Sequence, residues 1–278
     1  MTETEEIIRA GFPARPVDAH KYSVGTVAIA GGSAEYPHAP VIAGMGARAA
    51  GAGLVRLAVP AESRPCAGAW LPEATFAAFG EGEPLPKADV LVIGNGLGRS
   101  SRTDRLVRRC LAEWDGPLVL DADALHSLAT GAGEGVASRP GLRLALTPHE
   151  GEAARLLGRT REEIAGGRAA AAAEIAAHYG ATVALKGPRT LVVSAAGAET
   201  FENPAGNPAM ALGGMGDLLA GVIGARWARL KGEAFVAVAA GVWLHSAAAD
   251  RLVEEGGDPS LANVAEAIGR IRMALERG

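Results

Sequence analysis

The sequence has little of several residue types, and each shortage narrows the range of possible functions. Aromatic residues make up only 4% of the 278 residues, although 49% of the residues are hydrophobic. The core must therefore be aliphatic and rich in alanine, with secondary-structure elements that approach one another closely. Cysteine occurs only at Cys66 and Cys110, which do not have the spacing of metal ligands. A reduced, cytoplasmic protein is therefore expected.

Positive charge is also in short supply, with 27 basic against 31 acidic residues and a formal net charge of −4. This balance argues against a dedicated nucleic-acid surface. Four of the basic residues are lysines, namely Lys21, Lys87, Lys186 and Lys231. In a chain that otherwise uses arginine, a lysine suggests a position that requires a compact ammonium group. No run is expected to span a membrane, and residues 1–15 lack the apolar segment of a signal peptide.

The most informative stretch runs from Asn203 to Asp217, with the sequence NPAGNPAMALGGMGD. Its first part has closely spaced Asn, Pro and Gly residues, which are typical of turns. Beyond it, Leu219, Val222 and Ile223 recur at helical spacing and predict a helix over 218–231. The first N–H groups of a helix lack partners and lie at the positive end of its dipole. The glycine-rich entry therefore predicts an anion site, formed by Gly214, Met215 and Gly216.

Asp217 lies in the first turn of this helix, where two interpretations compete. A carboxylate there stabilises a helix through its dipole by a few tenths to about 1 kcal/mol, which would explain an isolated aspartate. It would not explain the neighbouring glycine run and the two Asn-Pro turns. A carboxylate beside a phosphate site is well placed to take a proton from the group that receives a phosphoryl. We therefore predict that Asp217 is the catalytic base of a phosphoryl-transfer reaction.

The rest of the chain alternates between short apolar runs and amphipathic or alanine-rich segments. Strands are predicted at 24–30, 54–59, 88–93, 117–120, 143–146, 182–185 and, as a hairpin partner, 191–194. Helices are predicted at 41–51, 102–114, 161–179, 218–231, 233–254 and 261–277. This pattern is typical of an α/β fold with a central, mostly parallel sheet, helices on both faces and a helical C-terminal third. We expect one domain over 1–278, in which 1–20 is a leading segment.

Five chemically distinctive segments each follow a predicted strand. They are residues 31–33, 94–98, 121–123, 147–152 and 186–190. Since the strands of a parallel sheet point the same way, these segments are expected to gather along one edge, where open α/β sheets bind ligands. Any one of them alone would be an ordinary turn, whereas five together favour a composite site.

Two of these segments carry side chains with specific chemistry. Lys186 suits a phosphate-facing ammonium group, and Thr190 adds a hydroxyl. His149 and Glu152 lie three positions apart at a helix start, where a neutral histidine could bind substrate and the glutamate could orient a metal-bound water. No second histidine completes a zinc site.

The remaining candidates leave alternatives open. Residues 94–98 (GNGLG) lack the full G-x-G-x-x-G spacing, which weakens an NAD-dehydrogenase interpretation, but their backbone could bind phosphate. Asp121 and Asp123 are compatible with a cation site and equally with a polar strand end. His178 and His245 lie in helical stretches, so structural or surface roles are expected for them.

Taken in chain order, these segments resemble the ADP-dependent NAD(P)H-hydrate dehydratase family of the ribokinase-like superfamily. The matching segments are His20-Lys21 with Gly25, Gly31 to Ser33, Gly51 to Val55, Ile93 to Gly98, Leu120 to Leu125, Leu146 to Glu152, Leu185 to Thr190 and Asn203 to Gly221. They cover nearly the whole chain, and Thr-Pro-His-x-Gly-Glu combined with Asn-Pro-x-Gly-Asn-Pro and Gly-x-Gly-Asp is specific. Related thiazole and pyrimidine kinases usually carry Asn at the position of His149.

The resemblance implies repair of hydrated NADH and NADPH (NADHX and NADPHX), with ADP converted to AMP and phosphate. Asp217 would deprotonate the ring hydroxyl, the amides of Gly214 to Gly216 would hold the phosphoryl, and elimination of phosphate would restore the ring double bond. Substrate contacts are expected from Ala39, Gly96, Gly98, His149 and Asp217. Nucleotide contacts are expected from Lys186, Gly187, Pro188, Arg189, Thr190 and Gly216. Glu152 would support Mg²⁺ through water.

The resemblance also implies a homotetramer, and alanine-rich helix faces such as 234–240 would permit close subunit packing. A separate NAD(P)HX epimerase is expected in the same pathway.

Two positions depart from the family pattern, since Asn95 stands where Pro is usual and His126 where Asn is common. The sequence leaves open whether NADHX or NADPHX is the preferred substrate and whether ADP or ATP is the phosphoryl donor. Two other functions also stay open: a ribokinase-type kinase of a small alcohol or vitamin precursor, and a non-catalytic nucleotide sensor.

Overall fold

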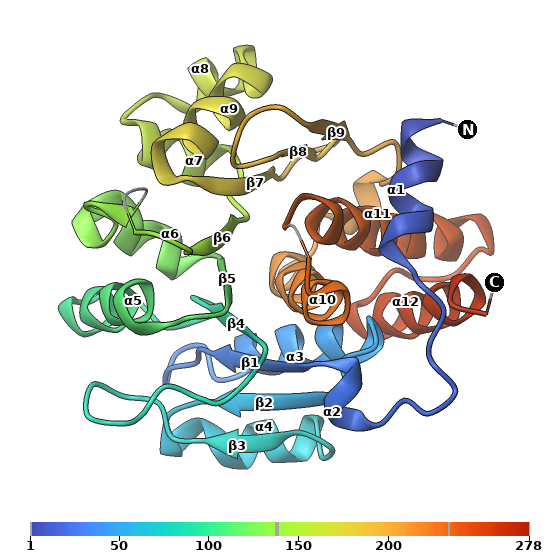
Figure 1. Cartoon of the computed structure of the whole chain (residues 1–278), viewed down its shortest axis with the longest axis horizontal. Coiled ribbons are helices and arrows are strands. Elements are labelled where there is room, and N and C mark those ends of the chain that lie inside the picture. Colours follow the sequence, from blue (N-terminus) through green and yellow to red (C-terminus); the bar gives the residue numbers. More distant parts are fainter. Residues whose placement is uncertain (1, 137–138, 233, 278) are drawn as a thin grey trace.

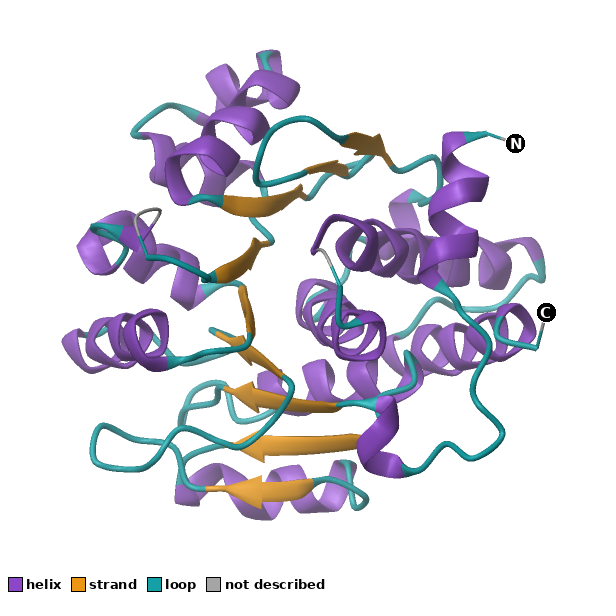
Figure 2. Cartoon of the chain, in the orientation of Figure 1, coloured by secondary structure: helices purple, strands orange, loops and turns teal. Residues whose placement is uncertain are grey.

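The computed structural model describes residues 2–136, 139–232 and 234–277, and its described strands form a single sheet (Figures 1 and 2). The strands are β1 (Thr26–Ala30), β2 (Leu54–Ala58), β3 (Thr75–Ala77), β4 (Val90–Ile93), β5 (Pro117–Leu120), β6 (Arg143–Leu146), β7 (Ala181–Leu185), β8 (Leu191–Val193) and β9 (Thr200–Glu202). Their order in the sheet is β3-β2-β1-β4-β5-β6-β7-β8-β9. Neighbours from β3 to β7 are parallel, and β8 and β9 are antiparallel additions. The predicted mostly parallel sheet is confirmed.

Helices cover both faces of this sheet. They are α1 (Glu3–Gly11), α2 (Lys21–Val24), α3 (Ala39–Ala49), α4 (Arg64–Trp70), α5 (Ser101–Glu113), α6 (Asp123–Ser127), α7 (Glu150–Leu157), α8 (Arg161–Gly166), α9 (Arg168–Tyr179), α10 (Met215–Leu230), α11 (Ala234–Glu254) and α12 (Leu261–Leu275). One face packs against α5, α6, α7 and α9, on the left of Figure 1, and the other against α3, α10 and α11, with α1 and α12 outside them. The predicted helical C-terminal third is therefore a layer over one face of the sheet.

The strands are apolar at successive positions because both faces are covered. In β1, Val27 and Ile29 belong to the cluster beneath α10, whereas Ala28 and Ala30 belong to the cluster on the α5 side. All five residues of the strand are buried. Near-continuous hydrophobic runs of this kind are typical of parallel strands buried on two sides.

The helix that carries Asp217, α10, packs against α3 with almost no space between the backbones. A Cβ on Gly46 would lie 2.1 Å from the Leu218 carbonyl oxygen, and a Cβ on Gly221 would lie 1.7 Å from the Ala43 carbonyl oxygen. Only glycine fits at such distances, as expected for a core that is poor in aromatic residues. This contact fixes the position of α10 on the sheet.

A buried arginine joins α10 to both ends of the described chain. The Arg226 guanidinium is fully buried and donates to the Ala50 carbonyl at 3.1 Å, to Glu276 Oε1 at 2.8 Å and to the Gly11 carbonyl. It also stacks 4.4 Å from the centre of the Phe12 ring. The predicted leading segment 1–20 therefore contains a helix, α1, whose end is held against the core.

Three expectations need correction. The predicted helix over 161–179 is two helices, α8 and α9, because Gly167 has non-helical backbone angles of φ −145° and ψ 46°. The segments 64–70, 75–77 and 200–202 were not predicted as elements and form α4, β3 and β9, whereas the helix start predicted at 149–152 is that of α7 (Glu150–Leu157). The alanine-rich face at 234–240 is not free for subunit packing, since Ala237, Ala239 and Ala240 are fully buried within the chain. Glu233, the predicted start of α11, lies outside the described residues.

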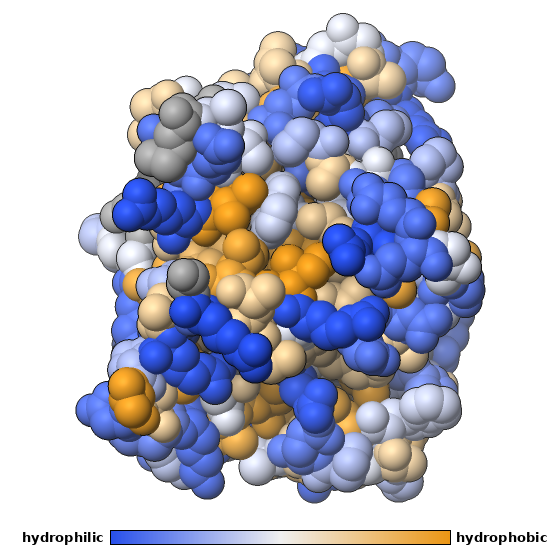
Figure 3. Space-filling model, turned by 90° about the vertical axis from the view of Figure 1, so that its right-hand side faces the viewer, coloured by the Kyte–Doolittle hydropathy of each residue, from blue (hydrophilic) through white to orange (hydrophobic). Residues whose placement is uncertain are grey.

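Helix α11 is long and apolar enough to cross a membrane by length and composition, contrary to the expectation that no run approaches such a span. However, 67% of its most apolar window is buried inside the structure, as in a protein core helix. The outer face on the right of Figure 1 is turned toward the viewer in Figure 3 and shows apolar side chains at its centre, surrounded by hydrophilic ones. A groove of about 620 Å³ between α11 and α12 is lined in part by Trp243, Ile271 and Leu275.

Candidate functional site

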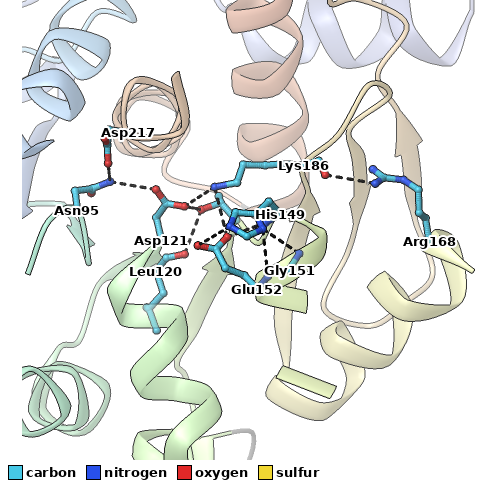
Figure 4. A network of polar contacts seen from close by, with 10 residues as sticks. Asn95, Leu120, Asp121, His149, Gly151, Glu152, Arg168, Lys186 and Asp217 are labelled. Atoms are coloured by element: carbon cyan, nitrogen blue, oxygen red, sulfur yellow. Dashed lines mark hydrogen bonds and ion pairs between the residues drawn. The ribbon is translucent and has the colours of Figure 1, made fainter. Parts of the chain in front are cut away.

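The predicted strand-end segments meet beside the start of α10, and hydrogen bonds link them (Figure 4). The Asn95 amide nitrogen donates to Asp217 Oδ1 at 2.7 Å and to Asp121 Oδ2 at 3.1 Å. The Lys186 ammonium donates to Asp121 Oδ1 at 2.8 Å. On the other side, the Gly32 N–H donates to the Asn95 carbonyl at 2.9 Å. Together with Thr147, which also bonds Asp121, the sheet edge therefore brings together groups from five separate segments and the catalytic candidate.

Asp121, only 1% exposed, is the centre of this network. Its carboxylate accepts from Asn95 and Lys186 and, at 2.7 Å, from the Thr147 hydroxyl. These donors occupy its oxygens, so the residue anchors three strand ends. No group of three or more His, Cys, Asp or Glu side chains that could hold a metal occurs in the described part of the chain.

Lys186 follows β7 and faces the start of α10. Its Nζ lies 3.8 Å from Glu152 Oε2, and a Cβ on Gly216 would lie only 3.3 Å from it. Burial by itself would lower the pKa of Lys186, but the carboxylates of Asp121 and Glu152 outweigh burial and raise it. The ammonium therefore stays charged, directly beside the predicted anion site.

The first turn of α10 has the backbone geometry of an anion site. Gly214 precedes the helix in the left-handed region, with φ 91°. Among the described residues the Met215 N–H donates to the Leu212 carbonyl at 3.3 Å, whereas the N–H groups of Gly216 and Asp217 have no acceptor. The Gly214 N–H likewise has no acceptor among the described residues, so the available donors belong to Gly214, Gly216 and Asp217, and of the three predicted residues Met215 has its N–H engaged.

Asp217 is half-buried at the same helix start. Burial, reinforced by the negative charge of Asp121, raises the pKa of Asp217 to about 7, although the Asn95 hydrogen bond and Lys186 act in the opposite direction. A general base is most effective when its pKa lies near the working pH. The structure therefore gives Asp217 the protonation behaviour of a base at neutral pH.

His149 and Glu152 form a capping box at the start of α7. His149 Nδ1 accepts from the N–H groups of Gly151 at 3.0 Å and Glu152 at 3.2 Å, while Glu152 Oε2 accepts from the His149 N–H at 2.8 Å. Burial and the nearby Lys186 lower the pKa of His149, so the ring is neutral and carries its proton on Nε2. The ring therefore has one N–H to offer a ligand.

The three small residues predicted to contact substrate lie at two places near this edge. A Cβ on Gly96 would lie 2.9 Å from the Ala39 Cβ, so these two residues are in contact. Gly98 has open space around its Cα, and its N–H donates to Asp123 Oδ2 at 2.8 Å. Gly96 and Gly98 both have positive φ, of 70° and 75°, which explains why glycine occupies both positions.

A cavity of about 450 Å³ opens beside Lys186 and Gly216. Its wall includes Gly187, Pro188 and Thr190 from the predicted nucleotide segment, together with apolar Met210, Met215, Leu219 and Val242. Arg189 is not among its lining residues, and its side chain pairs with Glu202 of β9. The structure thus brings most of the predicted nucleotide contacts to one cavity.

His245 also lines this cavity, although the sequence indicated only a structural or surface role. Its side chain is 4% exposed, and its Nε2 is buried without a hydrogen-bond partner among the described residues. Burial lowers the pKa of His245 to about 4, so the ring is neutral. His245 lies on α11, far along the chain from Lys186, so its neighbours in the sequence do not indicate that it lines the same cavity as Lys186.

Two anchors of the loops were also missed. The Asn207 amide and the Gly206 N–H both donate to Asp250 of α11, at 2.7 and 2.8 Å, and fix the turn that precedes α10. The Arg168 guanidinium donates to the carbonyls of Leu185 at 3.0 Å and Arg189 at 3.3 Å, and pairs with Glu150 at 2.7 Å. Arg168 therefore holds both ends of the segment 186–190.

Replacing Arg168 by methionine is expected to raise the Kd for adenine nucleotide about tenfold, because loss of these hydrogen bonds loosens the segment by about 1.4 kcal/mol. Isothermal titration with ADP measures this change. Arg251→Met is the matched control, since Arg251 lies on the surface and its one ion pair among the described residues is with Glu255, just beyond the end of α11. If the Arg168→Met variant bound ADP as tightly as the control, Arg168 would not be needed to hold the segment 186–190 in its binding conformation.

A mostly parallel sheet with an anion site and a half-buried carboxylate at the start of a central helix defines a ribokinase-like protein. The crystal structure of a ribokinase-like superfamily protein from Enterococcus faecalis has a TM-score of 0.84 at 26% identity, and the match covers 100% of this chain and 99% of that one. A family model described as NAD(P)H-hydrate dehydratase matches residues 27–269. The chain therefore belongs to the NAD(P)H-hydrate dehydratase family.

Individual relatives agree with this membership. The ADP-dependent (S)-NAD(P)H-hydrate dehydratase of Neisseria meningitidis is 41% identical over 256 residues, which cover 88% of this chain and 83% of the relative. The crystal structure of the Bacillus subtilis ADP/ATP-dependent NAD(P)H-hydrate dehydratase has a TM-score of 0.87 at 30% identity, and the match covers 98% of this chain and 97% of that one. The bifunctional NAD(P)H-hydrate repair enzyme of Gloeobacter violaceus is 41% identical, and the matched region is 48% of its length. The chain thus corresponds to about half of such bifunctional relatives.

Proposed function

We propose that this protein catalyses the ADP-dependent dehydration of hydrated NADH and NADPH to NADH and NADPH, with release of AMP and phosphate. One observation carries the proposal: Asp217, with a pKa of about 7, shares a helix start with unpaired N–H groups and the Lys186 ammonium. A proton acceptor and donors for a phosphoryl group are therefore side by side. Family membership supplies the substrate class.

In the first step Asp217 takes the proton of the ring hydroxyl, and the hydroxyl oxygen attacks the β-phosphorus of ADP. The bond between this phosphorus and the oxygen that bridges it to the α-phosphate breaks, and AMP leaves with the bonding electrons. The N–H groups of Gly216 and Asp217 and the charge of Lys186 stabilise the negative oxygens of the transferred group.

In the second step the phosphate ester leaves the ring as phosphate. A proton departs from the adjacent ring carbon, and its electron pair forms the double bond that converts the hydrated ring into NAD(P)H. Phosphorylation is useful because phosphate is a far better leaving group than hydroxide. The Lys186 ammonium, held by Asp121 at 2.8 Å, also faces the departing phosphate.

We assign the cavity beside Lys186 and Gly216 to the adenine nucleotide and the side with Ala39, Gly96, Gly98 and His149 to the hydrated dinucleotide. Glycine at 96 and 98 lets a ligand approach the backbone closely, and the neutral His149 can donate from Nε2. In this assignment the two ligands meet beside Asp217. The substrate hydroxyl and the β-phosphate can then approach each other directly beside the base.

The donor set fits a Mg²⁺ that is bound mainly by nucleotide phosphates and water. Glu152 has one oxygen, Oε1, outside its 2.8 Å capping hydrogen bond, and the oxygens of Asp121 are engaged. Mg²⁺ usually keeps several waters and needs only one or two protein carboxylates. We therefore propose that Glu152 holds such an ion through water, and the ion would neutralise phosphate charge when bound.

We further propose a cytoplasmic homotetramer that works with a separate epimerase. Cys66 and Cys110 are both free thiols, as expected in a reducing compartment. Most of 234–240 is buried. The better candidates for a subunit contact are therefore the groove between α11 and α12 and the apolar side chains of Val253 and Met273, which are 45% and 44% exposed. Sedimentation of the purified protein tests the subunit number.

The proposed reaction is tested by incubating hydrated NADH or NADPH with ADP and Mg²⁺ and following the regained absorbance of the reduced ring. We expect recovery that depends on nucleotide and yields AMP and phosphate in equal amounts. Replacing ADP by ATP in the same assay determines the preferred phosphoryl donor. Phosphorylation of a vitamin precursor without recovery of NAD(P)H would indicate a ribokinase-type kinase instead, and nucleotide binding without either activity would indicate a sensor.

A further inference from the structure

The hydrogen bond between Asn95 and Asp217 joins residues 122 positions apart, and its donor is unusually well fixed. Asn95 is fully buried after β4. Its carbonyl oxygen accepts from the Gly32 N–H at 2.9 Å, and Gly31 passes so close that a Cβ there would lie 2.3 Å from that oxygen. The backbone of Asn95 therefore has no room to shift relative to β1.

The orientation of the Asn95 amide is fixed as well. Its nitrogen bridges two carboxylates, donating to Asp217 Oδ1 at 2.7 Å and Asp121 Oδ2 at 3.1 Å. A flipped amide would turn its oxygen toward both carboxylates and would be repelled. In the observed orientation Asn95 Oδ1 is buried without a partner among the described residues. Leaving a buried polar atom without a partner lowers stability, and the hydrogen bond that this orientation gives to Asp217 is a functional reason for it.

We propose that Asn95 is the positioning residue for the base: its amide holds Asp217 Oδ1 and leaves Oδ2 to receive the proton of the substrate hydroxyl. Among the described residues no donor contacts Asp217 Oδ2, so this oxygen is available. The inference rests on the proposed function, in which Asp217 is the base. It also gives a role to a residue that departs from the family pattern.

The charged groups facing Asp217 show what the hydrogen bond does. Asp121 after β5 and Asp123 at the start of α6 both disfavour its ionised form, whereas Lys186 after β7 favours it. The Asn95 amide also favours the ionised form, and it does so at the oxygen that does not react. Without the amide, less of Asp217 would be ionised at neutral pH, and its carboxyl group could rotate.

The test uses the full chain with Asn95→Leu, which keeps a similar volume but has no donor, and Asn95→Ala, which is smaller, in case the first variant does not fold. Asn263→Leu is the matched control, since Asn263 is exposed on α12 and its amide bonds only the Asp258 carbonyl. Circular dichroism and the Kd for ADP establish that each variant is folded and still binds nucleotide.

We expect kcat at pH 7 to fall about tenfold or more in both Asn95 variants, because hydrogen bonds to charged groups are among the strong ones. The acid limb of the kcat profile should move to higher pH by about one unit, so that much of the loss is recovered at pH 9. The Asp217 carboxyl resonance of the resting protein should titrate at correspondingly higher pH. Asn263→Leu should leave all three measurements unchanged.

An acid limb and a carboxyl titration identical to those of the parent protein in a folded Asn95 variant would overturn the proposal, even if the rate fell. The proposed function fails in a different way. If the parent protein does not regenerate NAD(P)H from its hydrate with ADP, the reaction is wrong, whereas the carboxyl titration still reports whether Asn95 controls Asp217.

Discussion

Replacing Asp217 by asparagine is expected to lower kcat for NAD(P)H regeneration by about 10²–10⁴-fold, the usual contribution of general-base catalysis. Asparagine keeps the size of the side chain, and its oxygen can still accept from Asn95, so the helix start should remain intact. ADP affinity should therefore change only a few-fold. Steady-state kinetics with hydrated NADH and calorimetric titration with ADP measure the two effects separately.

The appropriate control for this substitution is Asp250→Asn, which changes a carboxylate that holds the preceding turn but does not lie beside Lys186. It should alter nucleotide affinity more than kcat. If Asp217→Asn lost only a few-fold in kcat, Asp217 would not be the base. If it lost ADP binding altogether, its role would be structural.

The same substitution should make the protein more stable, and more so at high pH. The pKa of Asp217 lies at about 7 in the folded chain and at 3.8 ordinarily. Between these values the folded state retains a proton that the unfolded chain releases, so Asp217 costs stability progressively as pH rises from about 4 to about 7. Asparagine removes this cost. The gain in Tm of Asp217→Asn should thus be larger at pH 8 than at pH 5, and equal gains would contradict the raised pKa.

Gly221→Ala is expected to cost about 3 kcal/mol or more in the free energy of unfolding, at the upper end of the usual range for overpacking. The added Cβ would lie 1.7 Å from the Ala43 carbonyl oxygen, and a backbone atom cannot move aside as a flexible side chain can. Helix α10 would have to separate from α3, which displaces Asp217 from the ends of β4 and β7. Urea unfolding and the dehydration assay should therefore both report a large loss.

Gly269→Ala provides the matched control on α12. There the added Cβ would meet only the Ala49 carbonyl oxygen at 3.9 Å, an ordinary contact. Alanine favours a helix over glycine by up to about 1 kcal/mol, so this variant should be neutral or slightly stabilised. Equal stabilities of the two variants would mean that α10 and α3 are not packed as closely as the structure has them.

Periodicity and turn chemistry predicted much of the fold because the relevant forces are local. The strands at 117–120 and 143–146 were predicted with the bounds they have, since apolar runs between polar turns mark strands buried on both faces. The break at Gly167 was missed because the alanines around it all favour a helix. The short strands β3 and β9 lie at the two sheet edges and bury too few side chains to give a pattern.

The candidate site could be predicted from the sequence where its residues lie next to informative neighbours, as Asp217 does beside its glycines. It was not predictable where contacts join distant segments. Nothing around Arg168 indicates that it holds the segment after β7, and nothing around His245 indicates a cavity. The sequence shows Asn95 as a departure from the family pattern, but its hydrogen bond to Asp217 is visible only in the folded structure.

The buried Arg226 has a consequence for how the molecule is made. Its partners lie at Gly11, Ala50 and Glu276, so the carboxylate that neutralises it is synthesised fifty residues after the arginine itself. Until Glu276 leaves the ribosome, α10 carries an uncompensated charge toward the core, and a buried charge without its partner is strongly destabilising. The helix that bears Asp217 is therefore secured against the core only when α12 docks. Activity should accordingly appear only after Glu276 has been synthesised.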